Sequence, residues 1–503
     1  MTVTRPGMDM SCILWKLPIS GFLGYFPRLL QGTMLVSRVN RMLFCWLFWV
    51  MVIPPVVGGN WPQFRGPNGS GVAVGGDYPV FFGPESNVVW KTAIPAGNSS
   101  PCVWGKWIFL TGQTGVQLET LCLDGGTGAI LWRKFVEIEK WEKGMGGAAA
   151  PTPATDGERV YVYFGPFGAI CYDFEGREIW RKKLPAPVTQ HGVGASPVVA
   201  NGRLYLARDG DVDSHLLALN AQDGAVLWKT DRPEFRRGFS TPLLWPEARP
   251  ELLILPGTLR IVAYEVAGGR ERWGVGGLPN EMVASPVFGD GLVFAAGWTP
   301  GAGASKLPDF DALLAQGDQD KDGRLTRDET PQGPARQQFF YSDANKDGFL
   351  TREEWDSITA IFGKSENALL AVRPDASMPE GTSRTVWKQT RGLPYVPTPL
   401  YLEGRVYTVK NGGLFSCYDA RTGKIHYQEE RLGALGDYYA SPVAGGGKIY
   451  CVSQPGTVVV IKAGDALEVL ARNSFKEPVM ATPALVDGRI YLRTQKHLYA
   501  LGK

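Results

Sequence analysis

Two stretches of twelve residues in the second half of the chain carry the side chains best suited to binding a metal ion. In the first stretch, carboxylates stand at positions one, three and five, glycine at position six and glutamate at position twelve. Its expected ligands are Asp318, Asp320, Asp322, Arg324 through its backbone carbonyl, Thr326 and Glu329. Oxygen ligands at this spacing wrap around one point, as a hard cation with about seven oxygen ligands requires. The first stretch therefore predicts a calcium site.

The second stretch begins at Asp343, shortly after the first stretch ends at Glu329, and repeats its pattern. Its expected ligands are Asp343, Asn345, Asp347, Phe349 through its backbone carbonyl, Thr351 and Glu354. Both stretches are similar to the loops of the EF-hand family, and the resemblance implies a short β-bridge between Leu325 and Leu350, the residues at position eight. Flanking helices are expected over residues 307–316, 337–341 and 353–362. The alternative is a pair of decayed acidic loops that bind nothing.

The close spacing of the two loops leaves room only for short helices between them. A large opening motion, as in a calcium sensor, is therefore not expected. We expect structural or weak sites, with dissociation constants on the order of 10⁻⁴ to 10⁻³ M.

A repeat of about 45 residues defines the elements that must position these loops. Its clearest copy, residues 194–231, contains four short apolar runs joined by turns, with Asn201–Gly202 and Asp223–Gly224 as turn signals. Each copy opens with a Ser-Pro or Thr-Pro pair, and the eight prolines are Pro101, Pro153, Pro197, Pro242, Pro286, Pro399, Pro442 and Pro483. Four short strands per repeat are typical of one propeller blade. We therefore predict an all-β fold, an eight-bladed β-propeller, with two smaller domains as the alternative.

The two ends of the repeat and one long gap within it complete this organisation. The last copy stops after its third strand, and residues 87–91 before the first copy resemble the missing fourth strand. We expect this N-terminal strand to close the ring, because an open ring leaves unpaired edges. The gap from Pro286 to Pro399 is more than twice as long as any other gap, so the fifth blade carries the helical EF-hand pair as an insertion. The predicted segments are a targeting segment (1–59), blades one to five in part (60–300), the insertion (301–365) and the remaining propeller (366–503).

The turn between the third and fourth strands carries a motif of its own. Asp124–Gly128 followed by Trp132 has the order Asp, two residues, Thr-Gly, three residues and Trp, and Asp419–Gly423 has the same order with Tyr427 in place of the tryptophan. This motif resembles that of the pyrroloquinoline-quinone-like propeller proteins, over about residues 61–503 apart from the insertion. The resemblance implies that the tryptophan docks between neighbouring blades. The closing residues are Trp132, Trp180, Trp228, Trp273, Trp387 and Tyr427.

The N-terminal segment, residues 1–59, does not belong to the repeat. Arg38 and Arg41 precede an apolar run over residues 42–57, and Gly58 and Gly59 follow it. This order is typical of a secretory signal, with Met34 as the initiator, and predicts an exported protein in the periplasm or outside the cell. An uncleaved membrane anchor is the alternative, although the apolar run is short for a span. Membrane contact is expected only through this segment.

Five cysteines follow the targeting segment: Cys102, Cys122, Cys171, Cys417 and Cys451. Three of them precede the turn Asp by two positions, where other blades have alanine. We therefore interpret them as small buried side chains. Cys102 and Cys122 form the one pair for which a disulfide is considered.

The loops between blades converge on one mouth of the central channel and form the expected binding face. They are Asn98–Ser99, Trp141–Gly147, Gln190–His191, Phe235–Arg237, Asn280–Met282, Tyr395, Asp437–Tyr439 and Lys476–Glu477. Their arginine, tyrosine and amide groups suit a polar ligand or a peptide segment. The net charge of +3, from 52 basic and 49 acidic residues, implies no nucleic-acid partner.

The resemblance leaves two classes of function. Quinoprotein dehydrogenases of this family hold their quinone over a tryptophan, beneath a disulfide of adjacent cysteines, and this sequence has no adjacent cysteine pair. The other class includes the scaffold lipoprotein of outer-membrane assembly. We therefore expect a calcium-binding propeller that acts as a protein- or ligand-binding scaffold. A quinone-dependent dehydrogenase, or another enzyme at the same face, is the alternative.

Overall fold

The computed structural model describes residues 59–139, 141, 147–300, 302–303, 307–375, 377–378 and 383–502. Of the predicted targeting segment, all but Gly59 lies outside the described residues. The compact unit that contains the described residues runs from Val57 to Lys503. No helix in this described part of the chain is both long enough and apolar enough to cross a membrane.

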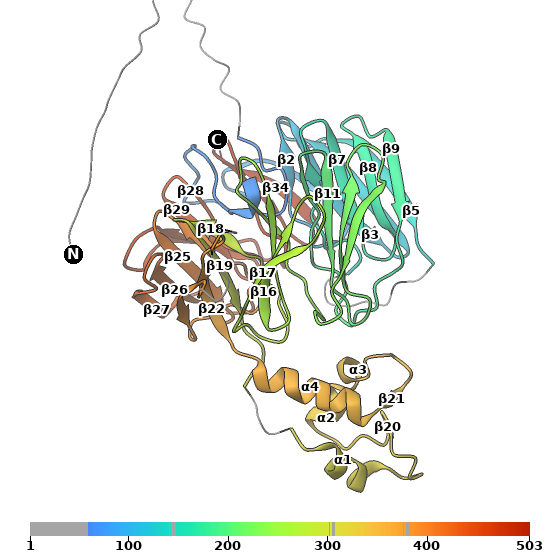
Figure 1. Ribbon diagram of the computed structural model, residues 1–503. Helices are drawn as coiled ribbons and strands as arrows, with labels where there is room; N and C mark the ends of the chain where they lie inside the picture. Colours follow the sequence, from blue (N-terminus) through green and yellow to red (C-terminus); the bar gives the residue numbers. More distant parts are fainter. Residues whose placement is uncertain are drawn as a thin grey trace, which may run out of the picture. The chain divides into compact units, whose positions relative to one another are not determined.

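Eight antiparallel sheets of four strands make up the main body of this unit (Figure 1). The first four blades are β2 (Cys102–Trp104), β3 (Trp107–Thr114), β4 (Gln117–Asp124) and β5 (Ile130–Glu137); β6 (Ala154–Thr155), β7 (Arg159–Phe164), β8 (Gly168–Asp173) and β9 (Glu178–Lys183); β10 (Val198–Ala200), β11 (Arg203–Arg208), β12 (His215–Asn220) and β13 (Val226–Asp231); β14 (Leu243–Trp245), β15 (Leu252–Gly257), β16 (Arg260–Glu265) and β17 (Glu271–Gly276). The other four are β18 (Val287–Gly289), β19 (Leu292–Gly297), β22 (Ala368–Val372) and β23 (Thr385–Gln389); β24 (Leu400–Leu402), β25 (Arg405–Lys410), β26 (Leu414–Asp419) and β27 (Ile425–Arg431); β28 (Val443–Gly445), β29 (Lys448–Val452), β30 (Thr457–Lys462) and β31 (Glu468–Ser474); β32 (Ala484–Val486), β33 (Arg489–Arg493), β34 (His497–Leu501) and β1 (Val88–Ala93). The predicted eight-bladed propeller is confirmed.

Burial along a blade follows from its packing between two neighbours. In β30, residues 458–461 are all buried and apolar, because both faces of this inner strand are covered. The outer strand β9 alternates between exposed and less exposed positions, with Trp180 as its buried residue. The hydrophobic core is accordingly divided into clusters that lie between adjacent blades.

Outer-strand tryptophans connect six of the eight blades to the blade that follows. Each indole N–H donates to a backbone carbonyl of the following blade at 2.8–3.2 Å: Trp90 to Gly125, Trp132 to Phe174, Trp180 to Ala221, Trp228 to Val266, Trp273 to Pro374 and Trp387 to Ala420. Gly128 shows why the turn motif needs glycine: its φ is 74°, and a Cβ there would lie 2.5 Å from the Trp90 ring. The predicted docking of the tryptophan is confirmed. Tyr427 takes the same place, but its hydroxyl is buried without a hydrogen-bond partner.

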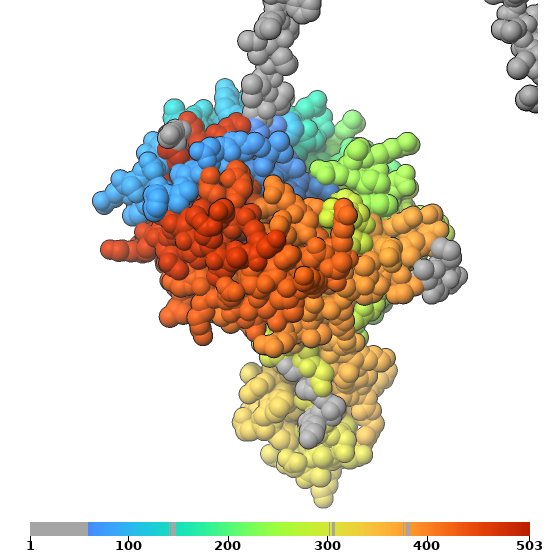
Figure 2. Space-filling model, turned by 90° about the vertical axis from the view of Figure 1, so that its left-hand side faces the viewer, coloured from blue at the N-terminus to red at the C-terminus, as the bar shows by residue number. Residues whose placement is uncertain are grey.

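The two ends of the described chain meet in one sheet. Strand β1 pairs antiparallel with β34, with Trp90 opposite Ala500. In Figure 2 the blue N-terminal part of the described chain lies beside the red C-terminal part. Before β1, residues 59–87 form an N-terminal segment that includes one short 3-10 helix, η1 (Pro67–Gly69).

The chain between β19 and β22 holds a small helical module, called the insertion here. Its elements are α1 (Phe310–Gly317), β20 (Leu325–Thr326), α2 (Pro334–Gln337), α3 (Phe339–Ser342), β21 (Phe349–Leu350) and α4 (Arg352–Lys364). Helix α1 begins later than predicted, at 310 instead of 307, because the Asp309 side chain caps it by accepting the Ala312 N–H. The predicted helix 337–341 is two short helices, since Gln338 between them has φ −94° and ψ 4°. Helix α4 begins behind a capping box of Thr351 and Glu354.

The five cysteines behave as small core residues. All five are buried free thiols, including the pair Cys102 and Cys122 that was considered for a disulfide. Burial raises the pKa of Cys122, Cys171 and Cys417 to about 12, so these thiols are neutral and unreactive at ordinary pH.

Candidate functional site

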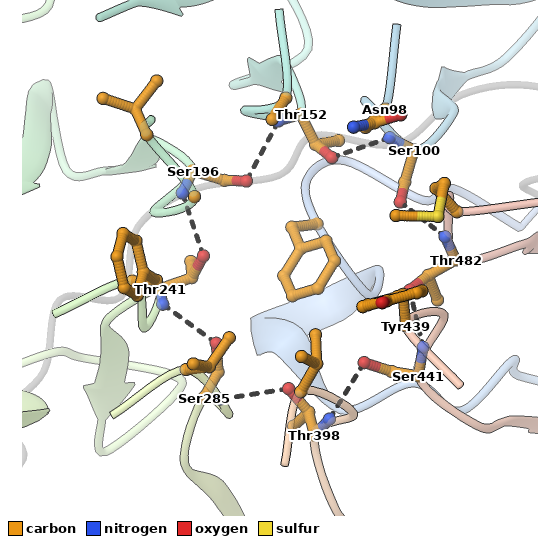
Figure 3. Close-up of a pocket in the computed structure, with 18 of the residues that line it drawn as sticks. Asn98, Ser100, Thr152, Ser196, Thr241, Ser285, Thr398, Tyr439, Ser441 and Thr482 are labelled. Carbon is orange, nitrogen blue, oxygen red and sulfur yellow. Dashed lines mark hydrogen bonds between the residues drawn. The ribbon is translucent and has the colours of Figure 1, made fainter. Parts of the chain in front are cut away.

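A closed circle of eight hydrogen bonds surrounds the central channel (Figure 3). The residue before each repeat proline donates its backbone N–H to the side-chain oxygen of the equivalent residue in the next blade, at 2.9–3.0 Å. In order these residues are Ser100, Thr152, Ser196, Thr241, Ser285, Thr398, Ser441 and Thr482. The last N–H, from Thr482, donates to Ser100. We call these residues the hydroxyl ring.

The sequence pattern contained the hydroxyl ring, but its role was not predicted. Serine or threonine precedes all eight repeat prolines, but the proline spacing indicates only the number of blades. A residue before proline is held in an extended conformation, which suits the start of a strand. The hydroxyl oxygen then satisfies a buried N–H that faces the channel rather than another strand.

A cavity of about 190 Å³ opens at the ring, and we call it the mouth cavity. Five of its side chains come from the predicted loops between blades: Asn98, His191, Glu281, Tyr395 and Tyr439. The remaining wall, apart from the hydroxyl ring, is apolar: Phe64, Ala150, Val193, Gly194, Phe239, Val283, Val396 and Met480. The predicted convergence of the loops is confirmed for these five residues.

The arginines expected at the mouth do not line the cavity. Arg237 is 5% exposed, and its Nε donates to Asp211 Oδ1 at 2.6 Å, while its Nη2 donates to Gln190 Oε1 at 2.8 Å. Phe235 is also buried, with the Arg232 guanidinium 3.9 Å from its ring centroid. Burying a cation requires a partner, and Asp211 provides it behind the cavity wall. The prediction of an arginine-rich mouth is therefore wrong.

Two other predicted mouth loops also differ. Residues 142–146 of the loop Trp141–Gly147 lie outside the described residues. In Lys476–Glu477, the glutamate contacts His497 Nδ1 at 3.0 Å and accepts the Thr494 hydroxyl at 2.7 Å, away from the cavity.

Glu281 is the one carboxylate among the described residues that line the mouth cavity. Burial raises its pKa, while nearby Arg237 and Tyr395 partly oppose that shift. Burial together with the Glu281 charge raises the pKa of Tyr395 to about 12. Burial and then Arg237 lower the pKa of His191, so this imidazole is neutral at pH 7.

Aromatic rings form much of the wall around Glu281. The His191 and Phe239 rings meet edge to face, with centroids 6.2 Å apart. Tyr395 makes a similar contact with Trp298 at 6.1 Å, and 41% of Trp298 is exposed. The cavity thus combines one carboxylate with an aromatic and apolar wall.

The N-terminal segment supplies one part of the cavity that the repeat could not predict. Phe64 lines the cavity, and the fully buried Arg65 next to it donates to the carbonyls of Pro442 at 2.8 Å and Pro399 at 2.9 Å. Burial lowers the pKa of the Arg65 guanidinium to about 9. Asn68 Nδ2 donates to the Leu244 carbonyl at 3.0 Å. The segment is therefore tied to blades four, six and seven.

The insertion carries the twelve predicted metal ligands in two loops with similar hydrogen bonds, and their binding of a metal stays a prediction. Carboxylate oxygens of Asp318, Asp320 and Asp322 all lie within 4.8 Å of one another. In both loops the first aspartate accepts the N–H of the loop glycine at 3.1 Å, from Gly323 to Asp318 and from Gly348 to Asp343.

The remaining ligand positions of the loops are also alike. Glu329 accepts the Thr326 N–H at 2.9 Å, and Glu354 accepts the Thr351 N–H at 3.0 Å. Leu325 pairs with Leu350, so the predicted β-bridge is confirmed. The side chains of Asn345 and Asp347 are joined by a hydrogen bond of 3.0 Å.

Tyr341, just before the second loop, connects the insertion to the propeller. Its ring lies under the guanidinium groups of Arg236 at 4.5 Å and Arg237 at 4.3 Å. Arg236 also donates to the Tyr341 carbonyl. The contact brings the second acidic loop next to the Arg237–Asp211 pair behind the mouth cavity.

Comparison with known proteins shows which proteins share this fold. The family model of the outer membrane protein assembly factor BamB matches residues 119–299. No curated protein matches the sequence. BamB from Moraxella catarrhalis has a TM-score of 0.53 at 12% identity, covering 83% of this chain and 99% of that chain.

Two enzymes of known structure share the same fold at a similarly low sequence identity. A europium-containing methanol dehydrogenase has a TM-score of 0.55 at 12% identity, over 89% of this chain and 98% of that chain. Quinohemoprotein alcohol dehydrogenase from Comamonas testosteroni has a TM-score of 0.54 at 12% identity, over 88% and 80%. Identities this low show the fold alone, and the fold is shared by proteins of different function. The chain is an eight-bladed β-propeller, and within it residues 119–299 match the BamB family model.

Proposed function

We propose that this protein is an exported, calcium-binding β-propeller that acts as a binding or scaffold module. Its partner, a protein or a polar ligand, would bind at the mouth where the loops between blades meet. The observation that carries the proposal is the wall of the mouth cavity, which offers recognition groups but no redox or nucleophilic set among the described residues.

The residues of the mouth cavity do not fit the quinone of the related dehydrogenases. Pyrroloquinoline quinone carries several carboxylates, and no arginine or lysine is among the described residues that line the cavity. The one carboxylate among the described residues there, Glu281, would repel such a ligand. The tryptophan and cysteine pair that the family places around its quinone are also absent from the described lining. We therefore assign no redox step to this cavity.

The two loops of the insertion do fit calcium. Asp318 Oδ1 and Asp343 Oδ1 are buried without a hydrogen-bond partner, although each aspartate's other oxygen accepts a glycine N–H. Buried carboxylate oxygens are normally paired, and a cation would pair both. The twelve predicted ligands would hold one ion in each loop, with the weak affinity expected of structural sites.

Two further features belong to this proposal. We infer that β1 closes the propeller ring, supported by its pairing with β34 and by the hydrogen bond from Thr482 to Ser100. We also infer that residues 1–59 direct export, supported by the charged and apolar pattern of the sequence alone. N-terminal sequencing of the protein secreted by a bacterial host tests the second inference, with Asn60 expected as the first residue.

Two measurements test the main proposal. Calorimetry should show two calcium ions per chain, and the double variant Asp318→Asn/Asp343→Asn should bind neither. After incubation with pyrroloquinoline quinone and calcium, gel filtration should leave no quinone absorbance on the protein, and alcohols should not reduce an artificial electron acceptor. Retained quinone with alcohol-dependent reduction would establish the dehydrogenase alternative.

A further inference from the structure

We infer that the mouth cavity binds an organic cation, the methylated ammonium group of a small molecule or of a modified lysine side chain. Glu281 would supply the opposite charge and the surrounding rings would face the methyl groups. This inference rests on the proposed binding function, because it names the ligand class of the same face.

The charge of the cavity favours a cation. Glu281 is partly buried, and no ion pair within 4 Å joins it to a basic side chain in the described part of the chain. Arg237, whose charge acts on Glu281, is already held by Asp211 at 2.6 Å and by Gln190 at 2.8 Å. A carboxylate that is partly removed from water and lacks an ion pair is stabilised by a ligand that brings a positive charge. An anionic ligand would be repelled by the Glu281 carboxylate.

The aromatic wall favours the same class of ligand. The rings of Phe64, His191, Phe239, Tyr395 and Tyr439 all line the cavity. Cations bind to the faces of aromatic rings, and quaternary ammonium groups are recognised in this way by cages of such rings. With His191 neutral, none of these rings carries a positive charge that would oppose the ligand.

The hydroxyl ring decides between a methylated and a primary ammonium group. A primary ammonium brings three N–H donors, each of which needs an acceptor when it leaves water. Each of the eight hydroxyl oxygens of the ring already accepts one backbone N–H at 2.9–3.0 Å, so at most one lone pair of each remains for a ligand. A quaternary group brings no donor, and its methyl groups suit Val283, Val396 and Met480 in the wall. The cavity therefore fits the methylated cation better.

Calorimetry with choline and its uncharged isostere 3,3-dimethylbutan-1-ol tests the inference on the full chain. The two molecules have nearly the same shape, so their affinity ratio reports the contribution of charge. We expect choline to bind at least tenfold more tightly. Equal affinities, or no choline binding at millimolar concentration, would overturn the inference without any variant having to fold.

Variants of residues that line the cavity test whether choline binds there. Glu281→Gln should lower the choline preference at least tenfold, and Tyr439→Leu should weaken choline more than its isostere. As the control, Glu403→Gln removes an equivalent charge from an exposed turn between β24 and β25. It should change neither the affinity for choline nor the affinity for its isostere. An unchanged preference in Glu281→Gln would contradict the assignment of this cavity.

A peptide pair separates the two sources of the cation. A peptide with trimethyllysine that binds at least tenfold more tightly than choline would indicate a protein partner, and equal affinity would indicate a small molecule; both results support a cation site. If no cation binds while the calcium and quinone experiments give the expected results, this inference fails and the proposed function stands. Retained quinone with alcohol-dependent reduction would contradict both this inference and the proposed function.

Discussion

Replacing one hydroxyl of the ring by a methyl group should weaken the propeller by a measurable amount. Thr241 is 5% exposed and its Oγ1 accepts the N–H of Ser196 at 3.0 Å. Thr241→Val keeps the shape of the side chain but leaves that N–H, on a residue only 3% exposed, without an acceptor. An unsatisfied buried donor costs about 1–3 kcal/mol in the free energy of unfolding.

The expected shift in melting temperature follows from the size of the propeller. The entropy of unfolding is about 2.1 cal/mol/K per residue, so about 440 residues that unfold together give ~0.9 kcal/mol/K. The loss of about 1–3 kcal/mol then lowers Tm by roughly 1–3 °C, which scanning calorimetry resolves. Thr241→Ser is the control: it keeps the acceptor, loses one methyl and should cost at most about 0.8 kcal/mol. A Thr241→Val protein as stable as Thr241→Ser would refute the assigned role of the ring.

A double variant asks whether the ring acts as one unit. Thr482 Oγ1 accepts the Ser441 N–H at 3.0 Å, on the opposite side of the ring from Thr241. Independent local losses should add to within about 0.5 kcal/mol. A larger combined loss of stability in Thr241→Val/Thr482→Val would show that breaking one hydrogen bond of the ring weakens the others.

Three further perturbations have expected outcomes. Asp343→Asn alone should reduce the calorimetric calcium stoichiometry from two to one, because the first loop keeps its ligands; complete loss of binding would show that the loops are not independent. Trp180→Phe removes the 2.9 Å hydrogen bond to the Ala221 carbonyl and should lower the free energy of unfolding by about 1–3 kcal/mol in chemical denaturation. Since burial raises the pKa of Glu281, the folded protein binds that proton more tightly, and stability falls as pH rises from the unfolded pKa of about 4.3 through the higher folded value. Glu281→Gln should therefore gain stability relative to the parent as pH rises above about 4; a constant difference in melting temperature would contradict the shift.

The propeller could be predicted because its determinants recur. The Ser/Thr-Pro pair returns in all eight repeats and the closing tryptophan in most of them, so the pattern does not depend on a chance match in one copy. The acidic loops stand out for a different reason, since their expected ligands lie within one short stretch of sequence, and their binding of calcium stays a prediction.

The wall of the mouth cavity could be predicted only in part. The loops that carry Glu281 and Tyr395 follow from counting strands, but the removal of Arg237 from the mouth depends on Asp211, which belongs to a different loop. Phe64 and Arg65 belong to a segment without repeat or periodicity, and the contacts of Arg65 reach Pro399 and Pro442, far away in the sixth and seventh blades. No pattern in a single sequence encodes such pairs.

The hydroxyl ring and the mouth cavity have a common physical origin. A strand that begins at the channel has no neighbour for its first N–H, and that donor must be paired because the site is buried. Pairing it with the side chain of the next blade, as Ser196 does with Thr241, also uses one of the two lone pairs of that hydroxyl oxygen. The same bonds that hold the blades together therefore leave the channel less polar than its serine and threonine content indicates. Under the proposed binding function, recognition at the mouth would depend on the few side chains that the ring does not use, above all Glu281 and the aromatic residues around it.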